Sequence, residues 1–154
     1  HVVSPPPRPL HQRAVLALYH RLLPFVTDRP DVELFPLPGD LQLGPDDVVE
    51  PDLFLVPVGP GPRLQRWQDA PTPILVTEVI SPSTAAHDRG TKRRIYMAAA
   101  VEQYWIVDLD ARIIERWRHG DRRPEICDAE LAFTFTNGIT GAIDLPEYFT
   151  DVWR

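Results

Sequence analysis

The chain has 154 residues, of which 44% are hydrophobic and 25% are charged, as is usual for a globular protein. This length allows a single domain with a buried core. The net charge of −6 at pH 7 argues against tight non-specific binding to DNA, because proteins that bind duplexes usually carry a basic surface. It does not exclude a nuclease, since carboxylates are what a metal site needs, and local basic clusters occur at residues 89–94 and 112–123.

Cysteine content and hydropathy indicate a compartment. The one cysteine, Cys127, allows no internal disulfide, which fits a reducing environment. No apolar run approaches the ~20 residues that span a bilayer, and the N-terminus has no basic segment followed by an apolar stretch. We therefore expect a cytoplasmic protein that does not enter a membrane.

The first half of the chain predicts one helix and several strands. Apolar residues at every fourth position predict a helix over 9–26, with Leu10, Ala14, Leu18 and Leu22 on one face. Strands are predicted at 32–37, 41–43 and 48–58, separated by Gly-containing turns. A loop follows over 59–73, and the β-branched and apolar run 74–80 predicts a strand that is buried on both faces.

The second half continues with a helix and a hairpin. Asp88 is the expected N-cap of a helix that runs to about residue 100. Strands at 104–108 and 113–117 are predicted to pair across a turn, and shorter strands at 125–127 and 133–136 follow. Residues 145–153 are expected to form a helical turn. This order predicts a mixed α/β domain with helices packed on a sheet.

Two carboxylates stand out against this background. Glu78 interrupts an apolar strand, where a glutamate is unfavourable unless a cation or hydrogen-bond donor meets it. Asp52 follows Pro51 at the start of the neighbouring apolar run, although a Pro-Asp pair also occurs in turns. Magnesium prefers oxygen ligands and keeps several waters, so two protein carboxylates are enough to hold it. Asp52 and Glu78 are therefore the candidate ligands.

The following helix supplies candidate supporting groups. Asp88, Lys92 and Tyr96 are spaced four residues apart, which places them on one helix face that can look towards Glu78. Lys92 could orient or activate a water, or neutralise developing charge. Each residue taken alone also has an ordinary explanation, which we favour for a single residue. These are a helix cap for Asp88, a solvated charge for Lys92 and a core position for Tyr96.

Other polar and aromatic residues carry weaker signals. His11 on the first helix is expected at the surface, with a smaller chance that it borders the site. Trp67 lies in a polar loop beside Arg66 and could touch a ligand, whereas the other tryptophans are expected in the core or an interface. The chain has no close cysteine or histidine pairs for zinc, no G-x-S-x-G turn and no Gly-rich phosphate loop.

An ordered set of motifs resembles a known family. The segments are Pro51-Asp52, residues 78–83 (EVISPS), residues 88–92 (DRGTK), Tyr96 and residues 104–108 (YWIVD). Together they resemble the Uma-two family of putative restriction endonucleases, within the PD-(D/E)XK nuclease superfamily. The resemblance extends over most of the chain.

The resemblance implies a restriction-endonuclease-like core, with a mixed central sheet flanked by helices, and cleavage of DNA with Mg²⁺ or Mn²⁺. It places Asp52 at the superfamily's PD aspartate and Glu78 at its acidic position. Ile80 stands where the superfamily lysine would be, and Lys92 on the following helix is the candidate replacement. Family members usually begin with a short helix and a hairpin, so residues 1–154 are expected to be one nuclease-like domain without that piece.

Three functional hypotheses follow. The first is a metal-dependent DNA endonuclease in which Asp52, Glu78 and Lys92 are catalytic and Asp88, Tyr96 and His11 support them. The second is a catalytically inactive binding or assembly module with the nuclease fold, which the acidic net charge and Ile80 favour. The third is a nuclease that acts on RNA or on a branched structure. A homodimer is expected for the endonuclease, because cutting both strands needs two sites, and the strand 113–117 is the predicted edge for it.

Overall fold

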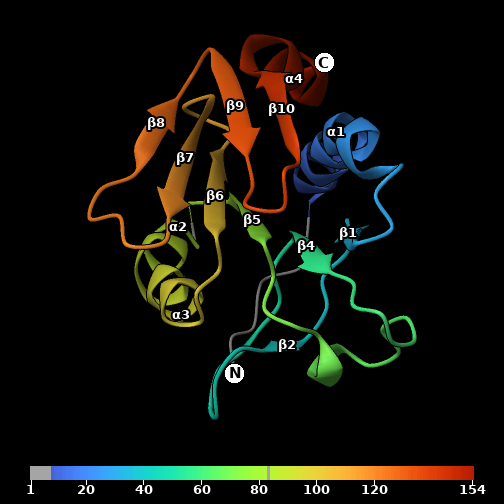
Figure 1. Ribbon diagram of the computed structural model, residues 1–154. Coiled ribbons are helices and arrows are strands. Elements are labelled where there is room, and N and C mark those ends of the chain that lie inside the picture. Colours follow the sequence, from blue (N-terminus) through green and yellow to red (C-terminus); the bar gives the residue numbers. More distant parts are fainter. Residues whose placement is uncertain (1–7, 83) are drawn as a thin grey trace.

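The computed structural model describes residues 8–82 and 84–154. Its centre is a six-stranded sheet in the order β1-β4-β5-β6-β7-β8 (Figure 1). These strands are β1 (Val32–Phe35), β4 (Leu53–Pro57), β5 (Leu75–Ile80), β6 (Gln103–Asp108), β7 (Ile113–Arg118) and β8 (Glu125–Cys127). Only β5 and β6 run parallel, while the other neighbours are antiparallel. The chain therefore has the mixed α/β architecture that the order of its elements predicts.

Helix α1 (Pro9–Val26) confirms the helix predicted from the fourfold spacing of apolar residues. Proline at its first position is favourable, because a proline there lacks an amide that would have no partner within the helix. The buried residues of the helix are Ala14, Val15, Leu18 and Leu22, which form its inner face. This face packs against β1 and against the C-terminal helix α4 (Leu145–Trp153).

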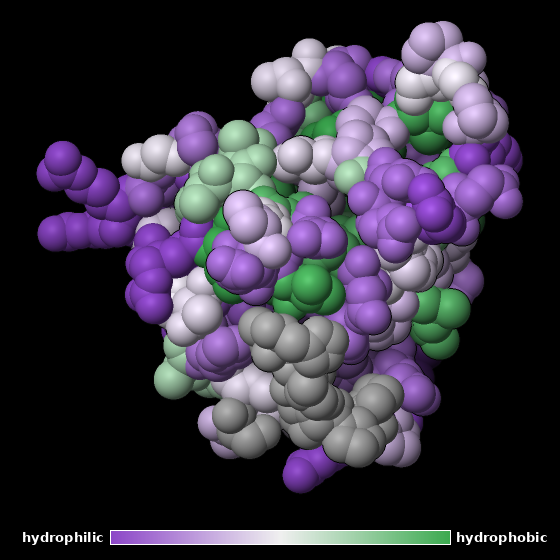
Figure 2. Space-filling view, turned by 90° about the horizontal axis from the view of Figure 1, so that it is seen from below, coloured by the Kyte–Doolittle hydropathy of each residue, from purple (hydrophilic) through white to green (hydrophobic). Residues whose placement is uncertain are grey.

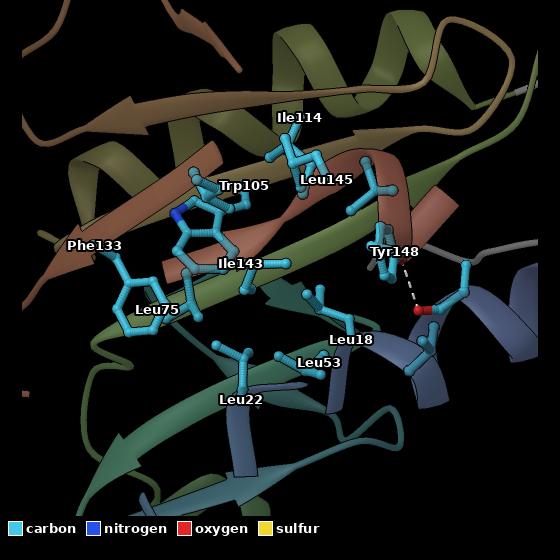
Figure 3. Packing of buried hydrophobic residues seen from close by; sticks show 14 of the residues in the cluster. Leu18, Leu22, Leu53, Leu75, Trp105, Ile114, Phe133, Ile143, Leu145 and Tyr148 are labelled. Carbon is cyan, nitrogen blue, oxygen red and sulfur yellow. Dashed lines mark hydrogen bonds between the residues drawn. The ribbon is translucent and has the colours of Figure 1, made fainter. Parts of the chain in front are cut away.

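The larger hydrophobic core lies on one face of the sheet. Alternate residues of the strands point to it, such as Leu53 and Leu55 of β4 and Trp105 and Val107 of β6. Helices α1 and α4 cover this face together with the hairpin of β9 (Glu130–Thr134) and β10 (Thr140–Asp144) (Figures 1 and 3). Trp105 is fully buried against Phe133 of the hairpin, with ring centroids 5.7 Å apart.

A second, smaller core lies on the opposite face. The intervening strand residues point here, including Phe54 of β4, Val76 of β5 and Ile106 of β6. Helix α3 (Arg93–Ala98) and the small sheet of β2 (Leu41–Gln42) and β3 (Val48–Val49) contribute the covering residues Tyr96 and Leu41. Because Glu78 has the same parity as Val76, its side chain belongs to this α3 side of the sheet.

The connection from β5 to the parallel strand β6 is helical. It consists of α2 (Ala85–His87), a π-helical turn η2 (Asp88–Lys92) and α3. The predicted N-cap role of Asp88 is wrong, because Thr84 precedes the first helical residue and Asp88 lies inside the helical connection with its side chain buried. Single π turns occur often at functional sites, since they re-aim side chains within a helix.

Other differences concern strand boundaries. The segment 48–58 forms two strands in two sheets, because the turn at Glu50-Pro51-Asp52 separates β3 from β4. The last predicted strand, 133–136, is instead β9, and β10 was not anticipated. The strand at 113–117 is not an edge, since β7 pairs with β6 on one side and with β8 on the other. The predicted 104–108 and 113–117 hairpin is confirmed.

The molecular surface is mixed in polarity. Figure 2 shows a face on which hydrophilic side chains surround smaller hydrophobic patches. Among the described residues, no helix combines the length and the apolar character needed to cross a bilayer.

Candidate active site

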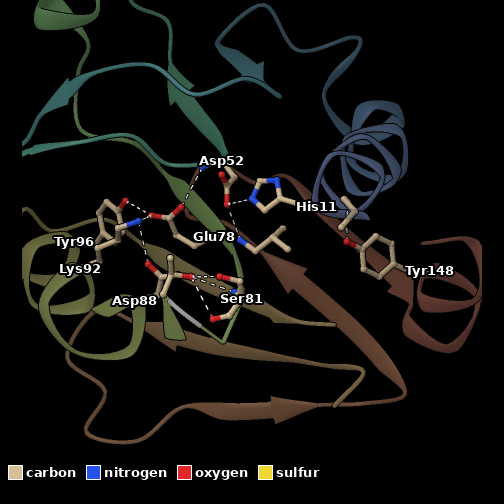
Figure 4. Close-up of polar contacts among 11 residues, drawn as sticks. His11, Asp52, Glu78, Ser81, Asp88, Lys92, Tyr96 and Tyr148 are labelled. Carbon is tan, nitrogen blue, oxygen red and sulfur yellow. Dashed lines mark hydrogen bonds and ion pairs between the residues drawn. The ribbon is translucent and has the colours of Figure 1, made fainter. Parts of the chain in front are cut away.

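The sheet brings Asp52 and Glu78 together. The antiparallel register of β4 and β5 pairs Leu53 with Thr77, so Asp52 and Glu78 are the next positions along the two strands. The amide of Asp52 donates to Glu78 Oε1 at 3.3 Å, and the amide of Val79 donates to Asp52 Oδ2 at 2.8 Å (Figure 4). The expectation that carboxylates from adjacent strands converge is therefore met, while their role as metal ligands stays a prediction.

Glu78 is buried among polar partners. Only 2% of the residue is exposed. Its Oε2 atom accepts a hydrogen bond from the Tyr96 hydroxyl at 2.9 Å and lies 3.0 Å from Lys92 Nζ. A buried carboxylate is costly unless such donors meet it, so these contacts explain how an apolar strand tolerates a glutamate.

Lys92 joins the strand carboxylate to the helix. Its Nζ atom also lies 3.0 Å from Asp88 Oδ1, four residues earlier in the helical connection. Both residues are buried, with 3% of Lys92 and 2% of Asp88 exposed. The sequence spacing of Asp88, Lys92 and Tyr96 predicted that these residues face Glu78, and Figure 4 shows Lys92 and Tyr96 pointing at its carboxylate. The ordinary explanation of Lys92 as a solvated helix residue is wrong.

The cluster has three carboxyl groups, those of Asp52, Glu78 and Asp88, beside the one amine of Lys92. Burial and the nearby charge of Asp52 raise the pKa of Glu78 well above its usual range, against the opposing effect of Lys92. Burial likewise raises the pKa of Asp88. Burial lowers the pKa of Lys92, but the carboxylates of Glu78 and Asp88 outweigh this effect and raise it. Lys92 is therefore an ammonium group at neutral pH.

Two buried tyrosines, Tyr96 and Tyr104, contact the cluster at Glu78 and at Asp88. Burial raises the pKa of both Tyr96 and Tyr104 well above the usual value, so their hydroxyls remain neutral hydrogen-bond donors. Tyr104 donates to the backbone carbonyl of Asp88 at 3.0 Å, and the two rings lie 4.8 Å apart. The carbonyl contact fixes the turn of helix from which Lys92 projects.

His11 reaches the site from the opposite side. Its Nε2 atom lies 3.1 Å from Asp52 Oδ2, and the imidazole is about three-quarters buried. The hydrogen bond to Asp52 raises the pKa of His11, against a smaller lowering by burial. His11 is thus not an ordinary surface residue, and its contact fixes the orientation of the Asp52 carboxylate (Figure 4).

A cleft of about 1010 Å³ opens over these residues. Asp52, Glu78, Asp88, Lys92 and His11 all line it. Its walls come from α1, from the loop after β1, from the segments that follow β5 and β6, and from the end of α4. The cluster is therefore accessible to a ligand although its members are largely covered.

The carboxylate oxygens of Asp52 and Glu78 suit a hard cation such as Mg²⁺ that retains several water ligands. Among the described residues, the Val79 amide and His11 both contact Oδ2 of Asp52, not Oδ1. In Glu78, Oε1 accepts only the 3.3 Å hydrogen bond from the Asp52 amide. One oxygen of each acid thus remains for a cation. No group of three or more His, Cys, Asp or Glu side chains in residues 8–82 and 84–154 is placed to hold a metal. Two carboxylates suit Mg²⁺ or Mn²⁺ rather than a closed cage.

Trp67 does not line the cleft, so its expected contact with a ligand stays a prediction. Its ring packs edge-on against Phe35 and Phe54, with centroids 4.9 and 5.5 Å away, and leaves no room for a side chain at Gly39. Sequence reasoning instead missed Leu37 and Trp153, which are exposed on the cleft. Their positions depend on how the loop after β1 and the end of α4 meet, and no local sequence pattern predicts that.

A family model described as "Putative restriction endonuclease", Uma2, matches residues 1–146. The chain belongs to this family. A crystal structure with the same fold is that of a putative nuclease belonging to DUF820 from Anabaena variabilis. It has a TM-score of 0.73 and 12% identity, over 98% of this chain and 86% of that one. No curated protein matches the chain. The resemblance seen in the motifs is thus confirmed for the family, and the nuclease-like fold for the architecture.

Proposed function

We propose that this member of the Uma2 family is a metal-dependent endonuclease that hydrolyses phosphodiester bonds in DNA. The observation that carries the proposal is the buried Lys92 ammonium, which touches Glu78 beside Asp52 at the floor of an open cleft. A lysine and two carboxylates are the groups that this family's superfamily uses for that reaction. Ile80 stands on the strand where the superfamily has a lysine and has no amine, so Lys92 of the helical connection supplies the ammonium group.

Asp52 and Glu78 are the proposed ligands of Mg²⁺ or Mn²⁺. When bound, the ion supplies Lewis-acid stabilisation of the phosphoryl oxygens and a water of lowered pKa. The excess negative charge of Asp52, Glu78 and Asp88 around a single lysine favours a divalent cation at this place.

Lys92 has an electrostatic role in this proposal. Because the carboxylates raise its pKa, it is a poor general base at neutral pH, and its proposed action is to orient the attacking water and to neutralise charge that develops on the phosphate. Asp88 and Tyr96 hold Lys92 and Glu78 in place, and His11 does the same for Asp52.

The proposal is tested by the nicking of supercoiled plasmid DNA in Mg²⁺. The parent chain should convert the plasmid to open circles, and Glu78→Gln should not. Glu130→Gln is the matched control, since Glu130 is an exposed strand glutamate that does not line the cleft. Equal nicking by the parent and by Glu78→Gln would exclude Glu78 as an essential group.

A non-catalytic binding or assembly module is the second candidate. The net charge of −6 favours it, because an acidic chain attracts DNA poorly. Calorimetric titration separates the two, since the endonuclease must bind Mg²⁺ or Mn²⁺ at or below millimolar concentrations. Absence of such binding together with absence of nicking would favour the module.

We further propose a homodimer, because cleavage of both strands of a duplex requires two sites and symmetric dimers are the commonest oligomers. β7 is internal, so the strands available for an extended sheet are β1 and β8 at the two edges. Light scattering should give twice the mass of the chain, and a monomer mass would contradict the dimer.

A further inference from the structure

Exposed apolar side chains gather at the mouth of the cleft. In the described part of the chain, four large hydrophobic residues are exposed, and three of them line this cleft. The three are Leu16, Leu37 and Trp153, with 47%, 68% and 40% exposure, and we call them the apolar rim. They come from α1, from the loop after β1 and from the end of α4. Apolar groups gathered at a concave site indicate a ligand with apolar surface.

Two of the three rim residues, Leu37 and Trp153, are constrained before any ligand binds. Leu37 stands between Pro36 and Pro38, and a residue before proline is confined to extended conformations. The indole of Trp153 donates to the carbonyl of Leu109 at 3.1 Å, which fixes one edge of the ring. Rigid groups lose little conformational entropy on binding, so the rim is suited to recognition.

A guanidinium group, that of Arg112, lies beside the exposed indole of Trp153. The guanidinium carbon of Arg112 lies 5.9 Å from the centroid of the Trp153 ring, and Arg112 is exposed at the β6–β7 turn. An aromatic ring beside an arginine matches the two parts of a nucleotide, since bases stack on aromatic rings and phosphates pair with guanidinium groups.

The charge of the cleft argues against a continuous duplex. Among the described residues that line the cleft, five carry a carboxylate and two, Arg8 and Lys92, are an arginine or a lysine. Lys92 already forms ion pairs with Glu78 and Asp88. These carboxylates repel the phosphates of a duplex and of a single strand alike. A duplex hides its bases in the stack, so it gains no contact with the apolar rim that would offset this repulsion. Unpaired bases have neutral rings that can pack on the rim. Their amino groups can donate hydrogen bonds to the carboxylates.

We propose that the apolar rim binds unpaired nucleobases, so that the substrate is a nucleic acid single strand, free or as a flap or loop within a duplex. This inference rests on the proposed nuclease function, because that function places a phosphodiester in the same cleft. It narrows the substrate from DNA in general to strands whose bases are exposed near the scissile bond.

Fluorescence anisotropy in EDTA measures this binding without cleavage. The probes are a short labelled DNA single strand, the same sequence as a blunt duplex, and its RNA counterpart. The parent should bind the single strand at least about tenfold more tightly than the duplex. Trp153→Ala should weaken single-strand binding about tenfold, while Trp153→Phe should retain most of it. Ile126→Ala is the matched control and should change nothing, since exposed Ile126 lies on β8 and does not line the cleft.

Leu37→Ser serves as a second rim variant in case Trp153→Ala unfolds, and it should also weaken single-strand binding selectively. Equal or tighter binding of the duplex, no binding of the single strand, or full affinity in the folded rim variants would overturn the inference. The DNA and RNA arms identify which strand the site prefers. Calorimetric titration with Mg²⁺, in the parent and in Glu78→Gln, fails or succeeds independently, because it reports metal binding by Asp52 and Glu78 and not base binding.

Discussion

Lys92 Nζ lies 3.0 Å from Glu78 Oε2, and both residues are almost completely buried, with 3% and 2% exposed. A buried ion pair of this kind adds little net stability relative to apolar residues, because both charges lose their hydration. Stability alone therefore does not explain its presence among buried apolar strand residues. The same contact also makes the two residues energetically dependent on each other.

Lys92→Met should therefore be strongly destabilising. The substitution leaves Glu78 and Asp88 buried without their cation, which costs about 3 kcal/mol in the free energy of unfolding. The double variant Lys92→Met/Glu78→Gln should recover part of this loss, because one of the unpaired charges is then removed. Urea unfolding of the parent, of Lys92→Met, of Glu78→Gln and of the double variant checks both expectations. Strictly additive losses would show that the pair is not coupled.

Glu78→Gln should change the pH dependence of stability. Burial raises the pKa of Glu78 in the folded chain above its unfolded value of about 4.5, so the folded state binds more protons between these two values. The contribution of Glu78 to stability is thus present below the unfolded pKa and is lost as the pH rises through the folded one. Relative to the parent, metal-free Glu78→Gln should become more stable as the pH is raised from about 5 to about 8. A stability difference that does not vary with pH would be inconsistent with this cause.

Tyr96→Phe should impair the site more than the fold. The variant loses one hydrogen bond to Glu78, at a cost of about 1 kcal/mol in unfolding free energy. Loss of a partner that orients Glu78, the proposed metal ligand, should lower Mg²⁺ affinity about tenfold. Tyr148→Phe is the matched control, because its buried hydroxyl donates to the carbonyl of Ala14, away from the carboxylates. Similar Mg²⁺ affinities for the two variants, measured by calorimetry, would argue against a role for Tyr96.

His11→Ala should weaken Mg²⁺ binding about tenfold through Asp52. The imidazole and the Val79 amide both contact Asp52 Oδ2, so removing His11 frees the carboxylate to rotate. His20→Ala is the control, since His20 is exposed on the same helix and does not line the cleft. Unchanged calorimetric affinity in His11→Ala would show that the amide alone positions Asp52.

The sequence predicted the parts of the site that depend on local pattern. Glu78 was recognisable because a carboxylate interrupts an apolar strand, and Lys92 and Tyr96 because their spacing places them on one helix face. Aspartate is common at helix caps, which favours a cap for Asp88, yet the helix begins at Ala85 and Asp88 is a buried residue inside the helical connection. Residue propensities describe α-helices and their caps, so they do not predict a π-helical turn such as residues 88–92.

Longer-range relationships were harder to predict. His11 is 41 positions from Asp52 in the chain, and only the packing of α1 on the sheet brings their side chains together. Strand β7 looked like an edge because β8 is only three residues long and polar at its start. The apolar rim could not be predicted either, because Leu16, Leu37 and Trp153 are far apart in the sequence and meet only in the folded chain.

A crystal soaked in Mn²⁺ and measured at the manganese absorption edge tests the central claim most directly. Anomalous density should lie between the carboxylates of Asp52 and Glu78 in the parent and be absent from Glu78→Gln. Density bound elsewhere, or no density between these two carboxylates at millimolar Mn²⁺, would contradict the assignment of this cluster as the metal site.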